Sequence, residues 1–124
     1  MSDSSQEPGK ARRAQVMGAD FVERAMSSAD AFSRPLQEWL NEHAWGTTWL
    51  RDGLDLKTRS LCTCAMLASL GRSTELRGHI RGAINNGATA TEIREVCFTA
   101  QYMPVHRRLL RRSETPAKCC RNLV

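Results

Sequence analysis

The segment DLKTRSLCTCAMLASLG, residues 55–71, decides the fold class of this 124-residue chain. Asp55 is a residue type that caps helix N-termini, and Gly71 is the type that ends helices in the left-handed conformation. Between them, residues 61–70 are nearly all apolar. The segment therefore predicts a helix running to about Leu70, and we expect this helix to be buried on most sides.

Two further helices are predicted after this segment. One begins after Ser73, carries apolar residues at three- and four-residue steps, and ends at Asn86-Gly87, a strong stop signal. The next opens at Thr89, where Glu92 three residues later completes a capping box. Its inner face is Ile93, Val96, Cys97 and Ala100. Because no segment alternates with a period of two, the predicted fold class is all-α.

The first half of the chain also has a helical pattern, with weaker boundaries. Apolar residues repeat at helical steps from Asp20, and Ser33 before Arg34-Pro35 is typical of a helix start, with Leu36, Trp39, Leu40 and His43 on one face. Residues 45–55 are interrupted by two glycines and are expected to form a loop anchored by Trp45 and Trp49. Residues 1–10 are polar, contain Pro8 and Gly9, and are expected to form a disordered lead-in.

The net charge of +5 is confined to one end of the chain. Residues 1–102 contain twelve Lys or Arg and twelve Asp or Glu, whereas residues 103–124 contain six basic residues and one acidic residue. A basic isoelectric point indicates nucleic-acid or membrane-surface binding only where the charge lies on a folded surface. The net charge of +5 is therefore a property of the C-terminal residues and gives little information about the function of the helical body.

Several classes of protein are disfavoured by the composition. The longest apolar run, residues 61–70, is shorter than the roughly 18 residues of a membrane span, and the N-terminus has no secretory pattern, so we expect a cytoplasmic protein. Cys62, Cys64 and Cys97 lie in apolar helical patterns and are expected to be reduced thiols. Cys62 and Cys64 point about 200° apart on a helix, and no metal-ligand spacing or nucleotide fingerprint appears, so neither a metal nor a cofactor is predicted.

His79 is the titratable residue most suited to chemistry, because it lies on the apolar stripe of its predicted helix. Glu75 lies four residues earlier and hence one turn away on the same face, where a carboxylate can set the tautomer and pKa of the imidazole. That pair could act as a general acid or base near neutral pH. The alternatives are a core histidine bonded to a carbonyl or carboxylate, and a solvated first-turn carboxylate.

Arginines surround this candidate pair. Arg77 and Arg81 are like charges four residues apart, which is slightly unfavourable unless an anion or acidic partner lies between them, and Arg72 precedes the helix. An anionic ligand would remove that cost. Solvated arginines, or ion pairs with another subunit, explain the pattern equally well.

Five ordered segments carry a family resemblance: FSRPLQE (32–38), AWG (44–46), GLDLKTRSL (53–61), AMLASLGR (65–72) and HIRGAINNG (79–87). Over residues 11–102 the chain resembles the 4-carboxymuconolactone decarboxylase family. The resemblance implies a helical domain over these residues, of the alkylhydroperoxidase D-like type, that assembles into a ring-like trimer or hexamer. It also implies cofactor-free conversion of 4-carboxymuconolactone to 3-oxoadipate enol-lactone and carbon dioxide, in the protocatechuate (β-ketoadipate) branch of aromatic catabolism.

The wider superfamily includes peroxidases with the pattern Cys-x-x-Cys-x-x-x-His. Counting back from His79, the two cysteine positions are occupied here by Arg72 and Glu75, so a thiol nucleophile is missing. For the decarboxylase that the resemblance implies, we expect His79 with Glu75 to handle the proton. Arg72 and Arg81 would hold the carboxylates of a small anionic lactone.

The family pattern is lost after residue 102. The family continues with a Gly-x-Pro turn and another amphipathic helix, whereas Pro104 interrupts this chain and arginines follow. We therefore expect residues 103–124 to form a weakly ordered basic tail without a regular last helix, of the kind that a shifted reading frame would produce and that could impair activity. The alternative functions are another lactone- or peroxide-handling activity, or a non-catalytic helical module whose tail binds nucleic acid. Arginines without interleaved aromatics argue against the last.

Overall fold

The computed structural model describes residues 3–101, and all regular elements in that range are helical, which confirms the all-α class. The elements are α1 (Asp3–Met17), α2 (Ala19–Ser27), α3 (Arg34–Trp39), the π-helix η1 (Leu40–Trp45), the 3₁₀-helix η2 (Thr48–Leu50), α4 (Leu56–Leu70), α5 (Ser73–Asn85) and α6 (Ala90–Gln101). The expectations for the tail over residues 103–124, including the absent last helix, lie outside the described residues.

The chain forms two compact units, which divide between Leu54 and Asp55. Unit 1 contains α1 to η2, and unit 2 contains α4 to α6. The domain expected over residues 11–102 therefore takes in parts of both units, and its boundaries stay a prediction.

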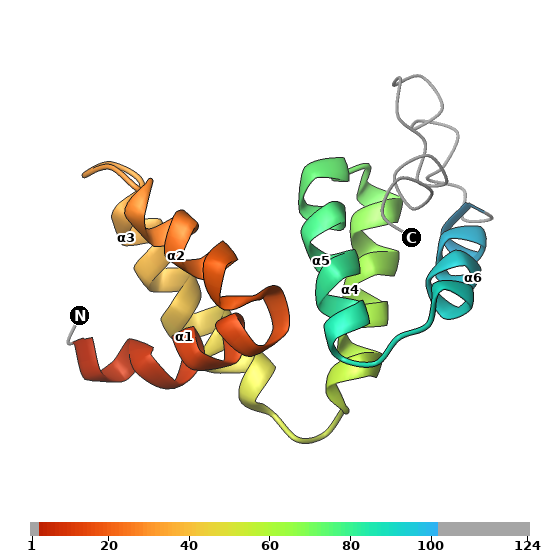
Figure 1. Ribbon diagram of the computed structural model, residues 1–124, viewed down its shortest axis with the longest axis horizontal. Helices are drawn as coiled ribbons and strands as arrows, with labels where there is room; N and C mark the ends of the chain where they lie inside the picture. The colour runs from red at the N-terminus through yellow and green to blue at the C-terminus, as the bar shows by residue number, and fades with distance from the viewer. Residues whose placement is uncertain (1–2, 102–124) are drawn as a thin grey trace. The chain divides into compact units, whose positions relative to one another are not determined.

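Unit 2 is built around α4, which contacts α5 and α6 (Figure 1). Its core consists of small and branched apolar side chains, namely Cys64, Ala68, Leu76, Ile80, Ala83, Ala88, Ile93, Cys97 and Ala100. The apolar stripes predicted on α5 and α6 supply most of this core. Ile84, near the end of α5, is 42% exposed and does not belong to this core.

The predicted helix ends of unit 2 are confirmed. The Asp55 side chain accepts a hydrogen bond from the Thr58 backbone N–H at 2.8 Å, and Gly71 ends α4 in the left-handed region with φ 69°. Thr89 and Glu92 form the predicted capping box: the Thr89 N–H donates to Glu92 at 2.8 Å, and the Glu92 N–H donates to the Thr89 hydroxyl at 3.1 Å. These caps satisfy backbone donors that a helix start leaves unpaired, and therefore fix where α4 and α6 begin.

The expectation that α4 is buried on most sides is wrong. Its buried residues are Ser60, Cys64 and Ala68, one stripe at four-residue spacing, whereas Met66 is 57% and Leu70 68% exposed. Two neighbouring helices cover only part of a helix surface. Of the described neighbours, α5 and α6 thus leave apolar side chains of α4 such as Met66 and Leu70 exposed.

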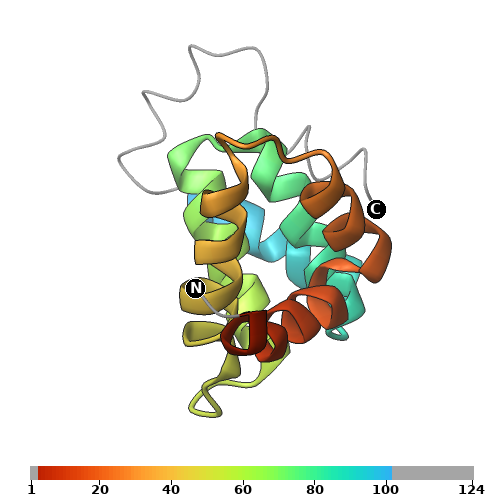
Figure 2. The same ribbon diagram turned by 90° about the vertical axis from the view of Figure 1, so that its left-hand side faces the viewer.

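Unit 1 depends on a close crossing of α1 and η1 (Figure 2). A Cβ built on Gly9 would lie 1.8 Å from the Asn41 carbonyl oxygen and 2.5 Å from the Gly46 amide nitrogen, so only glycine allows the two backbones to approach this closely. Gln6 and Gly9 are both buried. The expected disordered lead-in over residues 1–10 is therefore replaced by helix from Asp3 onward, because packing against η1 outweighs the local effect of Pro8 and Gly9.

The segment predicted as a loop after Trp45 is partly helical. η1 continues α3 through Trp45, and η2 follows at Thr48–Leu50, with Trp45 and Trp49 buried and stacked at a ring separation of 4.7 Å. The two tryptophans thus act as the predicted anchors. Leu36 and Trp39, which were predicted to share one helix face, are 57% and 47% exposed.

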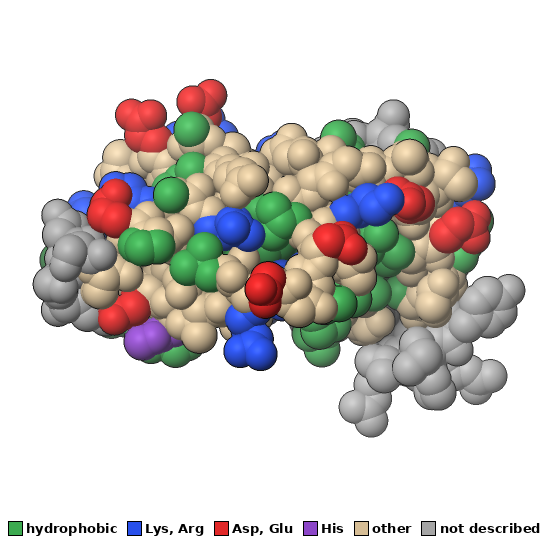
Figure 3. Space-filling model, turned by 90° about the horizontal axis from the view of Figure 1, so that it is seen from below, with side chains coloured by type: hydrophobic (Ala, Val, Ile, Leu, Met, Phe, Trp, Pro, Cys, Tyr) green, Lys and Arg blue, Asp and Glu red, His purple; other side chains and the backbone are tan. Residues whose placement is uncertain are grey.

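The cysteines and charges of the described residues match the expectations in part. Cys62 and Cys64 are free thiols as expected, but Cys97 is disulfide-bonded, so the expectation of a reduced thiol is wrong there. On the face drawn in Figure 3, acidic and basic side chains are interspersed. This distribution agrees with the balanced charge of residues 1–102.

Candidate active site

The predicted site residues lie along the first half of α5. Arg72 is the residue before the helix, Glu75 lies in its first turn and His79 one turn further on. Spacings of three, four and seven residues place side chains on one face of a helix. The local sequence thus brings these three groups to the same side of α5 before any tertiary contact is made.

Arg72 and Glu75 form an ion pair. The Arg72 Nε donates to Glu75 Oε1 at 3.1 Å, and Arg72 Nη2 donates to the same oxygen. This hydrogen bonding holds the pKa of the Glu75 carboxyl below its usual value, and the charges of Arg72 and His79 add to the effect. Both side chains remain exposed, at 62% for Arg72 and 42% for Glu75, so the pair is accessible to a ligand.

His79 lies at the border of the core. It is partly buried, and its neighbours Leu76 and Ile80 are 1% and 0% exposed. The charge of His79 contributes to the lowered pKa of the Glu75 carboxyl, so the two groups are electrostatically coupled. The imidazole is therefore neither a surface group nor a fully enclosed one, and a negative charge lies one turn away.

Arg81 does not join this group. It is exposed and lies two positions after His79, about 200° around the helix. It shares the opposite side of α5 with Arg77, four residues earlier. The structure thus brings together Arg72, Glu75 and His79, but points Arg81 away from them.

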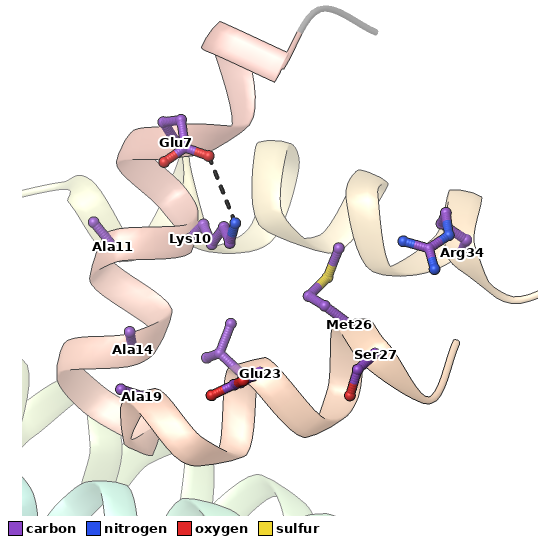
Figure 4. A pocket seen from close by; sticks show the side chains of 10 residues that line it. Glu7, Lys10, Ala11, Ala14, Ala19, Glu23, Met26, Ser27 and Arg34 are labelled. Atoms are coloured by element: carbon purple, nitrogen blue, oxygen red, sulfur yellow. Dashed lines mark ion pairs between the residues drawn. The ribbon is translucent and has the colours of Figure 1, made fainter. Parts of the chain in front are cut away.

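A hollow in unit 1 was not predicted from the sequence. It has a volume of about 560 Å³ and is bounded by α1, α2 and the start of α3 (Figure 4). Its lining residues are Glu7, Lys10, Ala11, Ala14, Ala19, Val22, Glu23, Met26, Ser27 and Arg34. The signal in the sequence is the row of small residues on one face of α1, whose significance depends on where α2 lies.

Neither a metal cluster nor a spanning helix occurs in the described part of the chain. Within residues 3–101, no group of three or more His, Cys, Asp or Glu side chains is arranged to hold a metal ion. None of the helices there combines the length and apolarity needed to cross a bilayer.

A comparison with known families covers the part of the chain that contains α5. The model of the carboxymuconolactone decarboxylase family matches residues 34–112, which is more than half of the chain. The chain belongs to the carboxymuconolactone decarboxylase family. The match starts later than the resemblance predicted over residues 11–102, and it continues ten residues beyond it.

Two relatives place this carboxymuconolactone decarboxylase family member among proteins with different named substrates. It is 49% identical over 88 residues to the nitrosuccinic acid decarboxylase npaB of Metarhizium robertsii, covering 71% of this chain and 62% of that protein. It is 42% identical over 84 residues to the 4-carboxymuconolactone decarboxylase of Acinetobacter baylyi, covering 68% and 63%. The matches thus span less than two thirds of either relative.

Proposed function

We propose that this protein is a carboxy-lyase that decarboxylates a small polycarboxylate. The observation that carries the proposal is family membership together with two relatives named as decarboxylases. Their named substrates share one chemical feature: a carboxylate can leave toward an electron-withdrawing group, a nitro group in one and a conjugated lactone in the other. The substrate class follows from that shared feature.

The proposed reaction requires an acceptor for one electron pair and a donor of one proton. The carbon–carbon bond to the carboxylate breaks, carbon dioxide leaves, and the electron pair moves into the nitro group or the conjugated carbonyl. The resulting anion then takes up a proton. Stabilising that developing charge and supplying that proton are the tasks left to the protein.

We assign the proton to His79 and an electrostatic task to Glu75. Because the ion pair with Arg72 keeps the pKa of Glu75 low, this carboxyl is ionised at neutral pH and has no proton to give. A fixed carboxylate one turn from His79 favours the imidazolium form, which can donate. In this proposal Glu75 stabilises the protonated form of His79 and does not itself transfer the proton, whereas the sequence-based expectation gave the proton to both residues.

Arg72 is the arginine best placed for a substrate carboxylate near His79. It lies on the same face and is 62% exposed, so its remaining donors are accessible. Arg81 lies on the other side of α5, so in this proposal it serves the substrate only if a neighbouring subunit brings a second surface to it. A homo-oligomer, a trimer or hexamer by family resemblance, is accordingly part of the proposal.

The specific reaction proposed first is the decarboxylation of 4-carboxymuconolactone to 3-oxoadipate enol-lactone. The alternative is decarboxylation of nitrosuccinic acid, which the 49% identical relative favours. Purified protein should be given each compound separately and carbon dioxide release followed. The compound with the higher kcat/KM is the substrate. If neither compound releases carbon dioxide, the proposal is wrong.

The residue assignments need variants that keep the helix. His79→Gln and Glu75→Gln should lower kcat, whereas Arg72→Gln should mainly raise KM. Arg94→Gln is a charge-matched control, because Arg94 is an exposed arginine of α6. Undiminished turnover in the His79 variant would exclude it as the acid.

A further inference from the structure

The hollow of unit 1 is open to the surface and has the volume of a small-molecule site. Its volume of about 560 Å³ falls inside the range of roughly 300 to 1,000 Å³ typical of small-molecule sites. Ala11 and Ala14 from α1 and Ala19 from α2 line it, and side chains this small leave the space between the helices open. Gly18, with φ 99°, is the single residue between α1 and α2 and makes the turn that joins them.

The floor of the hollow is held by a buried polar network. Val22 is 3% exposed, and the sulfur of Met26 accepts a hydrogen bond from Asn41 Nδ2 at 3.5 Å. Asn41 is fully buried and accepts from Arg13 Nη1 at 2.9 Å. The apolar floor is therefore preformed, which lowers the entropy cost of binding.

The network also carries a positive charge that is poorly compensated. The Arg13 guanidinium is 6% exposed and donates to the neutral amide oxygens of Asn41 and Gln37, both at 2.9 Å. It forms no ion pair with a described carboxylate, and burial lowers its pKa. This charge is linked through Asn41 to Met26 in the floor of the hollow, and a charge in surroundings of low dielectric acts over a longer range than a solvated one.

Among the described residues at the rim of the hollow, Arg34 is the cation best placed for an anionic ligand. Lys10 is paired with Glu7 at 3.7 Å, as Figure 4 shows. Arg34 donates to the Ala29 carbonyl at 3.1 Å but has no ion pair among the described residues, so its guanidinium can take a carboxylate. Glu23 also lines the hollow and would repel a second negative charge.

We propose that this hollow binds a small monocarboxylate with an apolar body, such as a short fatty acid. The carboxylate lies at Arg34, and the apolar body lies over Val22 and Met26 between the alanines. The residues that line the hollow are not those of the candidate active site on α5, and the proposal does not depend on the proposed decarboxylation. Its preference for one carboxylate also distinguishes it from the polycarboxylates proposed as substrates.

The proposal is tested by binding of hexanoate to the full-length protein. Methyl signals of Val22 and Met26 are followed by NMR while hexanoate, hexanol or hexylammonium is added. We expect chemical shift changes that saturate with hexanoate. Hexanol and hexylammonium should bind at least about tenfold more weakly, because each lacks the carboxylate that makes one charge-assisted contact. Equal binding of hexanol and hexanoate, or no shifts at these methyls, would overturn the proposal.

Three variants locate the site. Arg34→Gln should weaken hexanoate binding about tenfold, whereas Arg24→Gln, which removes an arginine of α2 that does not line the hollow, should leave it unchanged. Ala14→Leu should fill the hollow and abolish binding without loss of helix by circular dichroism. Equal effects of the two arginine variants would overturn the site. A second result would also overturn the proposal: the parent protein binds no hexanoate, and Ala14→Leu dissociates an oligomer. The hollow would then be an interface between copies of the chain.

Discussion

Replacing Gly9 by Ala tests whether the backbone crossing in unit 1 holds α1 in place. In the interior of an exposed helix, Gly→Ala stabilises by about 1 kcal/mol. Here the new Cβ would lie 1.8 Å from the Asn41 carbonyl oxygen, 2.5 Å from the Gly46 nitrogen and 2.8 Å from the Gly46 Cα. All three atoms belong to backbone, so no side-chain rotation relieves the overlap.

The expected cost follows from the displacement that α1 would need. Moving the Cβ from 1.8 Å to an ordinary contact of 3.4 Å requires a shift of about 1.6 Å. A shift of that size exceeds what the 2.9 Å hydrogen bond from Arg13 to Asn41 tolerates. Overpacking costs about 1–3 kcal/mol and the lost bond to a buried charged group about 1.5–3 kcal/mol. After the gain in helix propensity, we expect a net destabilisation of about 2–5 kcal/mol.

Urea unfolding followed by far-UV circular dichroism measures this change. Gly53→Ala is the matched control, because a Cβ there meets no atom within 4 Å and its φ is not in the left-handed region. That control should be neutral or more stable by about 0.4–1 kcal/mol, through the unfolded chain alone. If Gly9→Ala is as stable as the parent protein, the close crossing of α1 and η1 does not exist in solution.

Three further predictions concern unit 2. Thr89→Ala should destabilise by about 1 kcal/mol in urea unfolding because the capping box loses its hydroxyl, whereas Thr89→Ser should not; equal losses would argue against the cap. Asn86→Ala should cost about 1–3 kcal/mol, since Asn86 Nδ2 donates to the fully buried Ser60 hydroxyl at 2.9 Å; a double-mutant cycle with Ser60→Ala that shows strict additivity would contradict this. Arg72→Gln should raise the pKa of Glu75 toward its usual value in a carboxyl NMR titration. Because the pKa of Glu75 is lowered in the folded state, the pair stabilises the fold above the unfolded-state pKa, and this stabilisation is lost as the pH falls. The free energy of unfolding of the variant should therefore decrease less on acidification than that of the parent protein. An unchanged Glu75 titration would refute the pairing.

The candidate site was largely predictable because it is local. The separations of Arg72, Glu75 and His79 are spacings along a single helix, so no tertiary contact is needed to align them. The position of Arg81 on the other side follows from the same geometry. The hydrogen bonds from Arg72 to Glu75 did not follow from the sequence, because spacing along the helix does not give the side-chain conformations that form them.

Sequence by itself determined the helix ends of unit 2 and the family of this protein. Capping residues such as Asp55, Gly71 and Thr89 act on backbone groups a few positions away, so their effect can be predicted without the rest of the fold. Tertiary structure alone decided how much of α4 is covered, why the chain is helical from Asp3, and that α1, α2 and α3 enclose a hollow. Burial and cavities depend on which surfaces meet across long separations in sequence, and the close approach at Gly9 has no local signature that distinguishes it from a helix-breaking glycine.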